Sequence, residues 1–385
     1  MARPCSIDRW QHRWWCRRCG GSRRRCGAVP VADQRCAHRG ARHGRARVVV
    51  LDGAASADEW NSDEDAPVQG ILGVTHLPMM ARRDYLANEN DTHWTNHAIA
   101  RLEGYAAIVG PERTPRSLRT RNGLDMVTGL IRDACGKVTL DDLRVATTHN
   151  RVWSAVLWRN DVCEACADDP VLASAVQILR EWDSSEHVAS RGAILWRRFY
   201  EHFVGADPTP SVVFFTDQFD PADPLDTPSR INRHAGIGVV EALRRAVADL
   251  DGLPLDVSVG EVQYFTRAGK RHPIPGGPDE TGQYNLIDAK DGFVPGRGYP
   301  NVTYGTGYQL WVAFTADGPV AESILAYSQS EDPSSPYHSD QTEMCSRGET
   351  KQVRFHPTDV LSNAVKRVVL GNGRTVLSEM PSTSR

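Results

Sequence analysis

The sequence has very little lysine and no long apolar run. Only 5 of its 45 basic residues are lysine, so arginine carries almost all of the positive charge. No apolar stretch approaches the roughly 20 residues that a helix needs to cross a bilayer. No apolar core follows the charged N-terminus, as it would in a secretory signal. We therefore expect no membrane association, and the compartment stays undetermined.

Several common nucleotide-binding and hydrolase motifs are also missing. The sequence contains no GxGxxG, no P-loop and no HExxH, which excludes the usual dinucleotide, phosphate and zincin sites. It contains no GxSxG either, so the nucleophile elbow of an α/β-hydrolase is excluded. What remains is a chain of 385 residues with 40% hydrophobic content, which is typical of a globular protein that can bury a sizeable core.

The first 47 residues differ in composition from the rest of the chain. They hold 13 Arg and two Asp, a balance of +11, whereas the remaining 32 basic and 46 acidic residues give −14. Arg, Cys and Trp in this mixture are typical of a GC-rich gene read in another frame. We expect residues 1–47 to be unstructured or translated out of frame, and to pack against nothing. Residues 48–385 then form the folded domain.

An alternative for residues 1–47 is a basic arm that binds nucleic acid. Cys16 and Cys19 in CRRC have the spacing of a zinc knuckle, and arginines attract phosphate. A second cysteine pair at matching separation is missing, so we regard nucleic acid as the weaker choice of partner.

Helix signals dominate the middle of the chain. Thr139 followed by Asp142 resembles a capping box that opens a helix. A second helix is expected near 174–183. A third is expected in GVVEALRRAVADLDG, where Val239, Leu243, Val247 and Leu250 share one face and Gly252 ends the pattern.

Strand signals gather later in the chain. Four short stretches are rich in β-branched and aromatic residues, and they lie at 211–216, 261–266, 308–315 and 322–330. The stretch at 308–315 is apolar at consecutive positions, so we expect it to be buried on both faces. The fold class is therefore α+β, with a helical middle region and strands from the C-terminal third.

Two residue pairs have metal-ligand spacing. His93 and His97 are four apart, and Cys163 and Cys166 are three apart. No supporting carboxylate accompanies the histidines and no second pair accompanies the cysteines, so packing roles are favoured over ligation. We expect no metal and no cofactor.

Five longer stretches are distinctive, namely RRDYLANENDTHW, GPERTPRSLRTR, PADPLDTP, HPIPGG and YSQSEDPSSPYHSDQTE. Their order and spacing resemble those of the penicillin acylase family of N-terminal nucleophile hydrolases. The most similar branch is that of the aculeacin A and acyl-homoserine lactone acylases, and the resemblance runs from about Val48 to about Asp359. This resemblance implies part of a four-layer αββα fold, made as a precursor that is cleaved into two chains.

The resemblance also implies a mechanism and a site. A new N-terminal Ser is the nucleophile, and its own α-amino group is the base. A backbone N–H and an Asn side-chain amide hold the oxyanion, and the family's N-x-N-D motif places that Asn at Asn90. Asn88 is expected to shape the turn. Among Arg113, Arg116, Arg119 and Arg121, we name Arg116 as a supporting residue. The calcium site of some relatives is not carried over.

The nucleophile itself has no counterpart in this sequence. We therefore expect the chain to be the C-terminal part of an acylase that cleaves a small acyl-amide, such as an acyl-homoserine lactone, a lipopeptide or a β-lactam. The chain should be inactive by itself, and the missing N-terminal acylase portion should be its partner. The alternative is a non-catalytic acylase scaffold with a basic arm.

Overall fold

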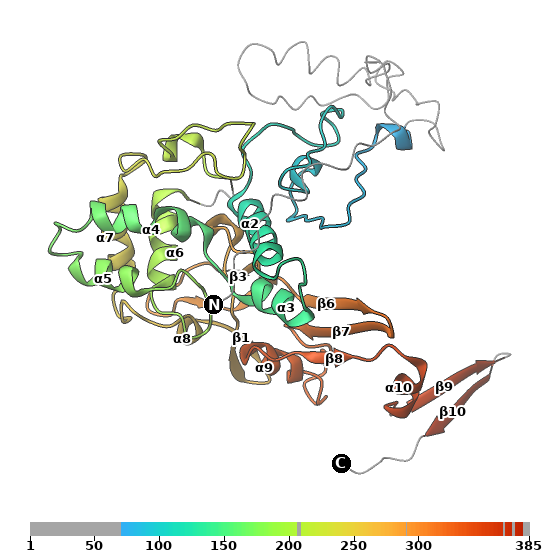
Figure 1. The fold of residues 1–385 in the computed structure, drawn as a ribbon. Helices are drawn as coiled ribbons and strands as arrows, with labels where there is room; N and C mark the ends of the chain where they lie inside the picture. The colour runs from blue at the N-terminus through green and yellow to red at the C-terminus, as the bar shows by residue number, and fades with distance from the viewer. Residues whose placement is uncertain (1–70, 206–208, 290, 365, 372–373, 380–385) are drawn as a thin grey trace, which may run out of the picture.

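The computed structural model describes residues 71–205, 209–289, 291–364, 366–371 and 374–379 (Figure 1). The predictions for residues 1–47 and for the boundary at Val48 fall outside these residues. The α-helices are α2 (Leu118–Asp133), α3 (Leu140–Thr148), α4 (Trp153–Ala165), α5 (Ala173–Glu181), α6 (Ala193–Phe203), α7 (Val239–Asp249), α8 (Val259–Val262), α9 (Asp340–Ser346) and α10 (Pro357–Ser362). Short 3₁₀ helices are η2 (Val74–His76), η3 (His93–Thr95), η4 (Val212–Phe214) and η5 (Asp279–Thr281).

The strands form four small sheets in the C-terminal third. They are β1 (Gln263–Arg267), β2 (Lys270–Pro273), β3 (Ile287–Ala289), β4 (Tyr299–Pro300), β5 (Val302–Gly305), β6 (Tyr308–Thr315), β7 (Gly318–Leu325), β8 (Lys351–Val353), β9 (Lys366–Gly371) and β10 (Arg374–Glu379). Their orders are β2-β1-β4, β3-β5, β6-β7-β8 and β9-β10. All pairs are antiparallel except β1 with β4. The predicted α+β class is confirmed.

Local sequence signals place the predicted helices. Thr139 and Asp142 form a complete capping box, in which each side chain accepts a hydrogen bond from the other residue's backbone N–H. The other two predicted helices are α5 and α7, and the burial of Val239, Ala242, Leu243 and Ala246 confirms the apolar face of α7. Three of the helices could therefore be read from caps and spacing alone.

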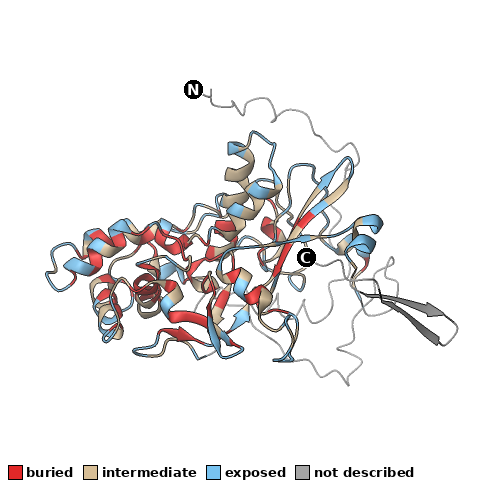
Figure 2. Cartoon of the chain, turned by 90° about the horizontal axis from the view of Figure 1, so that it is seen from below, coloured by how far each residue is buried: buried red, intermediate tan, exposed pale blue. Residues whose placement is uncertain are grey.

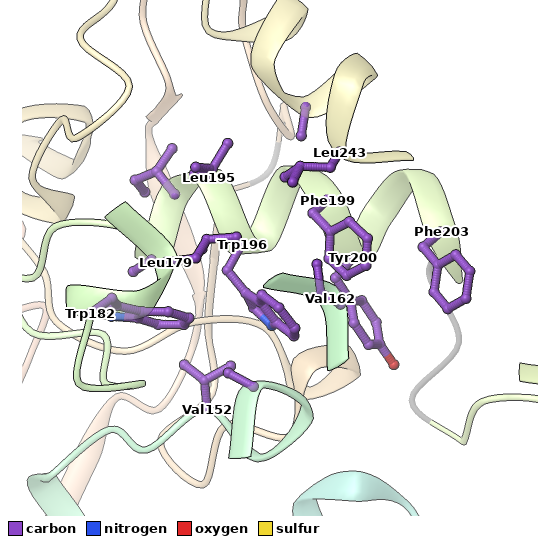
Figure 3. Packing of buried hydrophobic residues seen from close by; sticks show 14 of the residues in the cluster. Val152, Val162, Leu179, Trp182, Leu195, Trp196, Phe199, Tyr200, Phe203 and Leu243 are labelled. Atoms are coloured by element: carbon purple, nitrogen blue, oxygen red, sulfur yellow. The ribbon is translucent and has the colours of Figure 1, made fainter. Parts of the chain in front are cut away.

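The main hydrophobic core lies among α4, α5, α6 and α7. Figure 2 shows buried positions concentrated in this helical body, and Figure 3 shows Trp196, Phe199, Tyr200 and Phe203 along one helix, α6. Trp196 has no exposed surface, and its Nε1 donates to Ser154 Oγ over 3.0 Å. Burying aromatic side chains of this size supplies a large part of the hydrophobic free energy of folding.

The start of α6 requires a glycine. Gly192 has φ of 104°, and a Cβ there would lie 2.8 Å from the Cβ of Trp182. A larger residue would push Trp182 away from Trp196, whose ring centroid lies 6.1 Å from its own. The close approach of these two segments therefore depends on Gly192.

The strand predicted at 211–216 is wrong. Residues Val212–Phe214 form η4, and Phe215 makes only an isolated bridge with Ile231. Val212 and Val213 are exposed, so their side chains lack the half-buried sheet surface that β-branched residues favour. No other described strand pairs with this segment.

The other strand predictions are confirmed with corrections. The strand expected at 261–266 is β1, but Glu261 belongs to α8, where it forms a capping box with Ser258. The strand expected at 322–330 is β7, which begins earlier, at Gly318, and ends at Leu325, so the part of the prediction beyond Leu325 is wrong. The stretch at 308–315 is β6, yet burial on both faces is wrong, since Tyr308, Leu310 and Phe314 are exposed.

None of the helices within the described ranges is both long enough and apolar enough to cross a bilayer.

Candidate active site

The NEND stretch forms a tight turn on the surface. Asn90 has φ of 62°, in the left-handed region, which asparagine tolerates better than most residues. Its backbone N–H donates to Asn88 Oδ1 over 2.9 Å, the side-chain-to-backbone bond that asparagines use to build turns. Asn88 Nδ2 in turn donates to the Asp91 carbonyl over 3.4 Å. Asn88 therefore lies where a residue that shapes the turn should lie.

Asp91 fastens this turn to the beginning of α2. Its Oδ2 accepts from Thr120 Oγ1 over 2.8 Å and from the Ser117 N–H over 3.5 Å. Ser117 is the N-cap of α2, and its side chain accepts from the Thr120 N–H. A carboxylate at a helix N-terminus is stabilised by the unpaired N–H groups and the helix dipole. The orientation of the turn is thus tied to a long helix.

Arg116 holds Asp91 and does not contact Asn90. Its guanidinium is almost fully buried, and Nη1 donates to Asp91 Oδ1 over 2.7 Å and to Thr92 Oγ1 over 3.0 Å. It also lies 5.0 Å from the ring centroid of Trp94, a favourable cation–π distance. Burial lowers the pKa of Arg116, partly opposed by Asp91. Arg116 therefore supports the turn by binding the carboxylate of Asp91.

Arg119, in the first turn of α2, is the arginine that contacts Asn90. Its Nη1 donates to Asn90 Oδ1 over 2.7 Å and to the Glu89 carbonyl over 3.0 Å, while Nε donates to the Tyr284 carbonyl over 3.1 Å. A guanidinium has donors only, so the amide oxygen of Asn90 must face it and Nδ2 must point elsewhere. Within the described part of the chain, no acceptor binds Asn90 Nδ2. The geometry therefore leaves an oriented, unused amide donor.

Nothing in the sequence distinguishes Arg119 from its three neighbouring arginines. Arg113 is exposed and pairs with Glu103, and Arg121 binds the carbonyls of Leu225 and Pro228. Only the direction in which each side chain leaves the start of α2 separates the four. That direction is set by the contact between α2 and the turn, which no spacing rule encodes.

Arginines also bring a third of the five resembling stretches, PADPLDTP, to this region. Arg121 reaches the two carbonyls within PADPLDTP, and Arg101 binds the carbonyls of Pro221 and Ala222. Arg101 and Arg116 both lie over the ring of Trp94, Arg101 at 5.5 Å. The loop that carries PADPLDTP is thus fastened to the segment that carries Asn90. The last stretch is fastened separately, by Arg267 to the carbonyls of Ser330 and His338.

Glu89 is a buried acid inside the same turn. It is 5% exposed, and its carboxyl lies so close to α2 that a Cβ at Gly123 would be 2.4 Å from Oε1. Burial raises the pKa of Glu89 to about 7, with Arg119 opposing and Asp91 adding to the shift. Burial raises the pKa of the nearby Tyr284 phenol, and Glu89 adds to that shift. Glu89 therefore changes its protonation state near neutral pH instead of near pH 4.5, and sequence alone gives no sign of this.

We expect Glu89→Gln to flatten part of the pH dependence of stability. Because the folded pKa of about 7 lies above the ordinary value of 4.5, the unfolded chain releases this proton first as pH rises. The contribution of Glu89 is therefore fully present below pH 4.5 and is lost as pH passes 7. Urea unfolding at pH 5 and pH 7.5 should show a smaller difference in the variant, by up to about 3 kcal/mol.

The exposed Glu181 provides the control for this measurement. Glu181→Gln should follow the wild-type pH dependence. Glu186 and Glu280 carry the same upward pKa shift to about 7, so a decline with pH should remain in Glu89→Gln. An unchanged wild-type slope in that variant would show that Glu89 is not the buried acid described above.

The two pairs with metal-ligand spacing have structural surroundings. His93 lies in η3 and its Nε2 is 3.1 Å from Glu112 Oε1, whereas His97 lies beyond η3 with its Nε2 3.1 Å from Asp84 Oδ2. Cys163 and Cys166 are buried thiols on and at the end of α4, and burial raises the pKa of both. The described residues contain no group of three or more His, Cys, Asp or Glu side chains arranged to hold a metal ion.

Comparison with known proteins places the chain in a family. The family model described as Penicillin amidase matches residues 25–362, which include the turn that carries Asn90 and α2. The chain belongs to the penicillin amidase family.

Two curated acylases are similar in sequence to most of this chain. The aculeacin-A acylase of Actinoplanes utahensis is 35% identical over 333 residues, which is 83% of this chain and 41% of that protein. The acyl-homoserine lactone acylase PvdQ of Pseudomonas fluorescens is 33% identical over 330 residues, 80% of this chain and 40% of that protein. This chain therefore spans about two fifths of the length of the curated relatives it matches.

A solved structure was also found. The thermostable penicillin G acylase from Alcaligenes faecalis aligns with 66% of this chain and 53% of its own, at a TM-score of 0.33 and 15% sequence identity.

Proposed function

We propose that this chain forms part of an amide hydrolase of the penicillin acylase type, in which Asn90 donates to the oxyanion. In such a reaction a nucleophile attacks the amide carbonyl carbon and the carbonyl oxygen becomes negatively charged. A fixed N–H donor at that oxygen stabilises the transition state more than the ground state. The observation that supports this role is the Asn90 amide, with Oδ1 held by Arg119 and Nδ2 left without an acceptor among the described residues.

The relatives suggest the substrate class. Two of them are named for the substrates they deacylate, aculeacin A and acyl-homoserine lactones. We propose that this chain acts on an amide joining an acyl group to a lactone or peptide nucleus. In this scheme Asn90 contacts only the reacting carbonyl. It therefore determines the type of reaction, whereas selectivity for the length of the acyl chain depends on other residues.

We further propose that the nucleophile comes from polypeptide outside the 385 residues. The family reaction uses an N-terminal nucleophile, and an internal turn such as Asn88–Asp91 cannot supply a free α-amino group to act as its base. The chain covers only 41% of the aculeacin-A acylase, so the rest of such an enzyme is the natural source of the missing groups. This chain alone then carries only part of the active site.

The test compares the 385-residue chain with a complemented form. The chain alone should not hydrolyse a chromogenic fatty-acyl amide above the rate of buffer. Co-expression with the part of the aculeacin-A acylase that this chain does not match should produce hydrolysis. Turnover by the purified chain alone, lost on substitution of Asn90, would refute the claim that the nucleophile lies elsewhere. Purified complex without turnover would refute the proposed function.

A further inference from the structure

The outer strand of the β6-β7-β8 sheet is unprotected on one edge. Strand β6 pairs with β7 from Tyr308 opposite Leu325 to Thr315 opposite Gly318, without a bulge. No other described strand pairs with its outer edge. Figure 1 shows β6 and β8 on the two sides of β7. An open edge presents a row of backbone N–H and C=O groups that can pair with another strand.

The two edges of this sheet differ in how they are protected. Strand β8 has three residues and begins at the exposed Lys351, and short, charged edges discourage pairing. Strand β6 has eight residues, YQLWVAFT, and contains neither a charged residue nor a proline. Natural proteins rarely leave such an edge open to solvent, because it promotes aggregation. The β6 edge therefore has the features of a pairing site.

One face of β6 is packed and the other is bare. Trp311 is 5% exposed, and its Nε1 donates to Thr147 Oγ1 of α3 over 2.8 Å. Tyr308, Leu310 and Phe314 alternate with it and point to the opposite face, where they are 57%, 48% and 89% exposed. Opposite Leu310 on β7, Ser323 is buried. The bare apolar surface therefore follows the outer strand.

We propose that β6 receives an extended, apolar strand from the remaining portion of the acylase. We call the outer edge of Tyr308–Thr315, with the side chains of Tyr308, Leu310 and Phe314, the β6 surface. The incoming strand would complete the backbone hydrogen bonds of β6, and its alternate side chains would cover the three exposed residues. The choice of this partner rests on the proposed function.

The length of the relatives favours this partner over a second copy of the chain. The matched part is 41% of the aculeacin-A acylase and 40% of the PvdQ acylase, so more than half of each relative has to find its place against the matched part. A second copy would instead pair β6 with β6 about a twofold axis. That pairing would occupy the only edge of this described sheet that is long and uncharged.

The β6 surface is tested by co-purification. Tagged chain is co-expressed with the part of the Actinoplanes utahensis acylase that it does not match, and the complex is measured by affinity recovery and native mass spectrometry. Leu310→Lys should reduce recovered complex at least tenfold, because a charge would enter a face that the incoming strand covers. Val171 is 71% exposed outside this sheet, so Val171→Lys is the matched control and should leave recovery unchanged.

Hydrogen exchange separates strand pairing from simple apolar contact. Amides of β6 should exchange more slowly in the complex than in the chain alone, and circular dichroism should confirm that Leu310→Lys folds. Three results would overturn the proposal: no complex with wild-type chain, a complex that Leu310→Lys leaves undiminished, or a dimer of the chain alone that Leu310→Lys dissociates. A wild-type complex that forms but does not hydrolyse the chromogenic amide would refute only the proposed function. Substitution of Asn90 should lower hydrolysis and leave the complex intact, because Asn90 lies outside the β6 surface.

Discussion

Asn90→Gly in the complemented acylase is expected to lower kcat by about 10² to 10³, the usual cost of removing one oxyanion donor. Glycine is the informative replacement because it adopts the left-handed φ of 62° found at Asn90 without strain. The backbone of the turn is then retained while the Nδ2 donor is lost. KM should change little, because the donor acts mainly on charge that develops in the transition state.

Asn301 offers a matched control for this substitution. It is also an exposed asparagine with φ of 60°, and it lies in the short connection between β4 and β5. Asn301→Gly should leave kcat and KM unchanged. Equal losses in the two variants would assign the effect to the turn backbone, and an Asn90→Gly enzyme with wild-type kcat would remove Asn90 from the oxyanion site.

Arg197→Ala is expected to cost about 1 to 3 kcal/mol of unfolding free energy, the range for leaving buried polar groups without their hydrogen-bond partner. Arg197 is 3% exposed. Its Nη1 donates to Gln263 Oε1 over 3.0 Å and its Nη2 to Asp288 Oδ1 over 2.8 Å. The guanidinium carbon lies 3.6 Å from the ring centroid of Tyr299. The arginine therefore joins α6 to β1 and β3.

The acids around Arg197 explain the size of this effect. Glu186 is buried, and burial raises its pKa to about 7 against the attraction of Arg197. Without the arginine, Glu186 and Asp288 lose a cation that no described neighbour replaces at the same place. Arg197→Lys should recover only part of the loss, because a single ammonium cannot reproduce the two-pronged contact with Gln263 and Asp288.

Urea unfolding at pH 7 measures this prediction, with Arg245→Ala as the control. Arg245 lies on α7, which packs against α6, and it pairs with Glu241 over 2.9 Å on a half-exposed surface. Its loss should cost about 0.5 kcal/mol or less. A loss for Arg197→Ala as small as that of the control would show that the network contributes no net stability.

Local sequence was sufficient to predict a helix where all the residues that determine it lie within one short segment. The capping box at Thr139 and Asp142 opens α3 because both partners lie within a single turn. The periodic apolar face of α7 predicted its burial for the same reason. The strand prediction for residues 211–216 was wrong, because residues with high β propensity form a strand only where a neighbouring strand can pair with them. None of the described strands lies beside this segment.

The candidate site was partly readable from sequence. Asn88, Asn90 and Asp91 form the turn that Asn and Asp favour, and the five stretches in order gave the family. Arg116 was predicted to be a supporting residue; its guanidinium binds Asp91 in the turn, and its role in the site stays a prediction. Arg119 makes the contact with Asn90 itself, and Glu89 lies buried beneath it. Neither could be predicted, because both depend on how α2 docks against the turn.

The sequence by itself determined the family, the α+β class, the principal helices and the position of Asn90. These follow from local caps, apolar spacing and motifs in register, which are properties of neighbouring residues. Only the tertiary structure decided which arginine orients the Asn90 amide and which face of β6 is exposed. It also decided which acid in the turn is buried and therefore has a pKa near neutral pH. Arg119 meets Asn90 across 29 positions and Tyr284 across 165. Such contacts form only when the packed chain brings distant segments together, and that packing sets each residue's burial and charge.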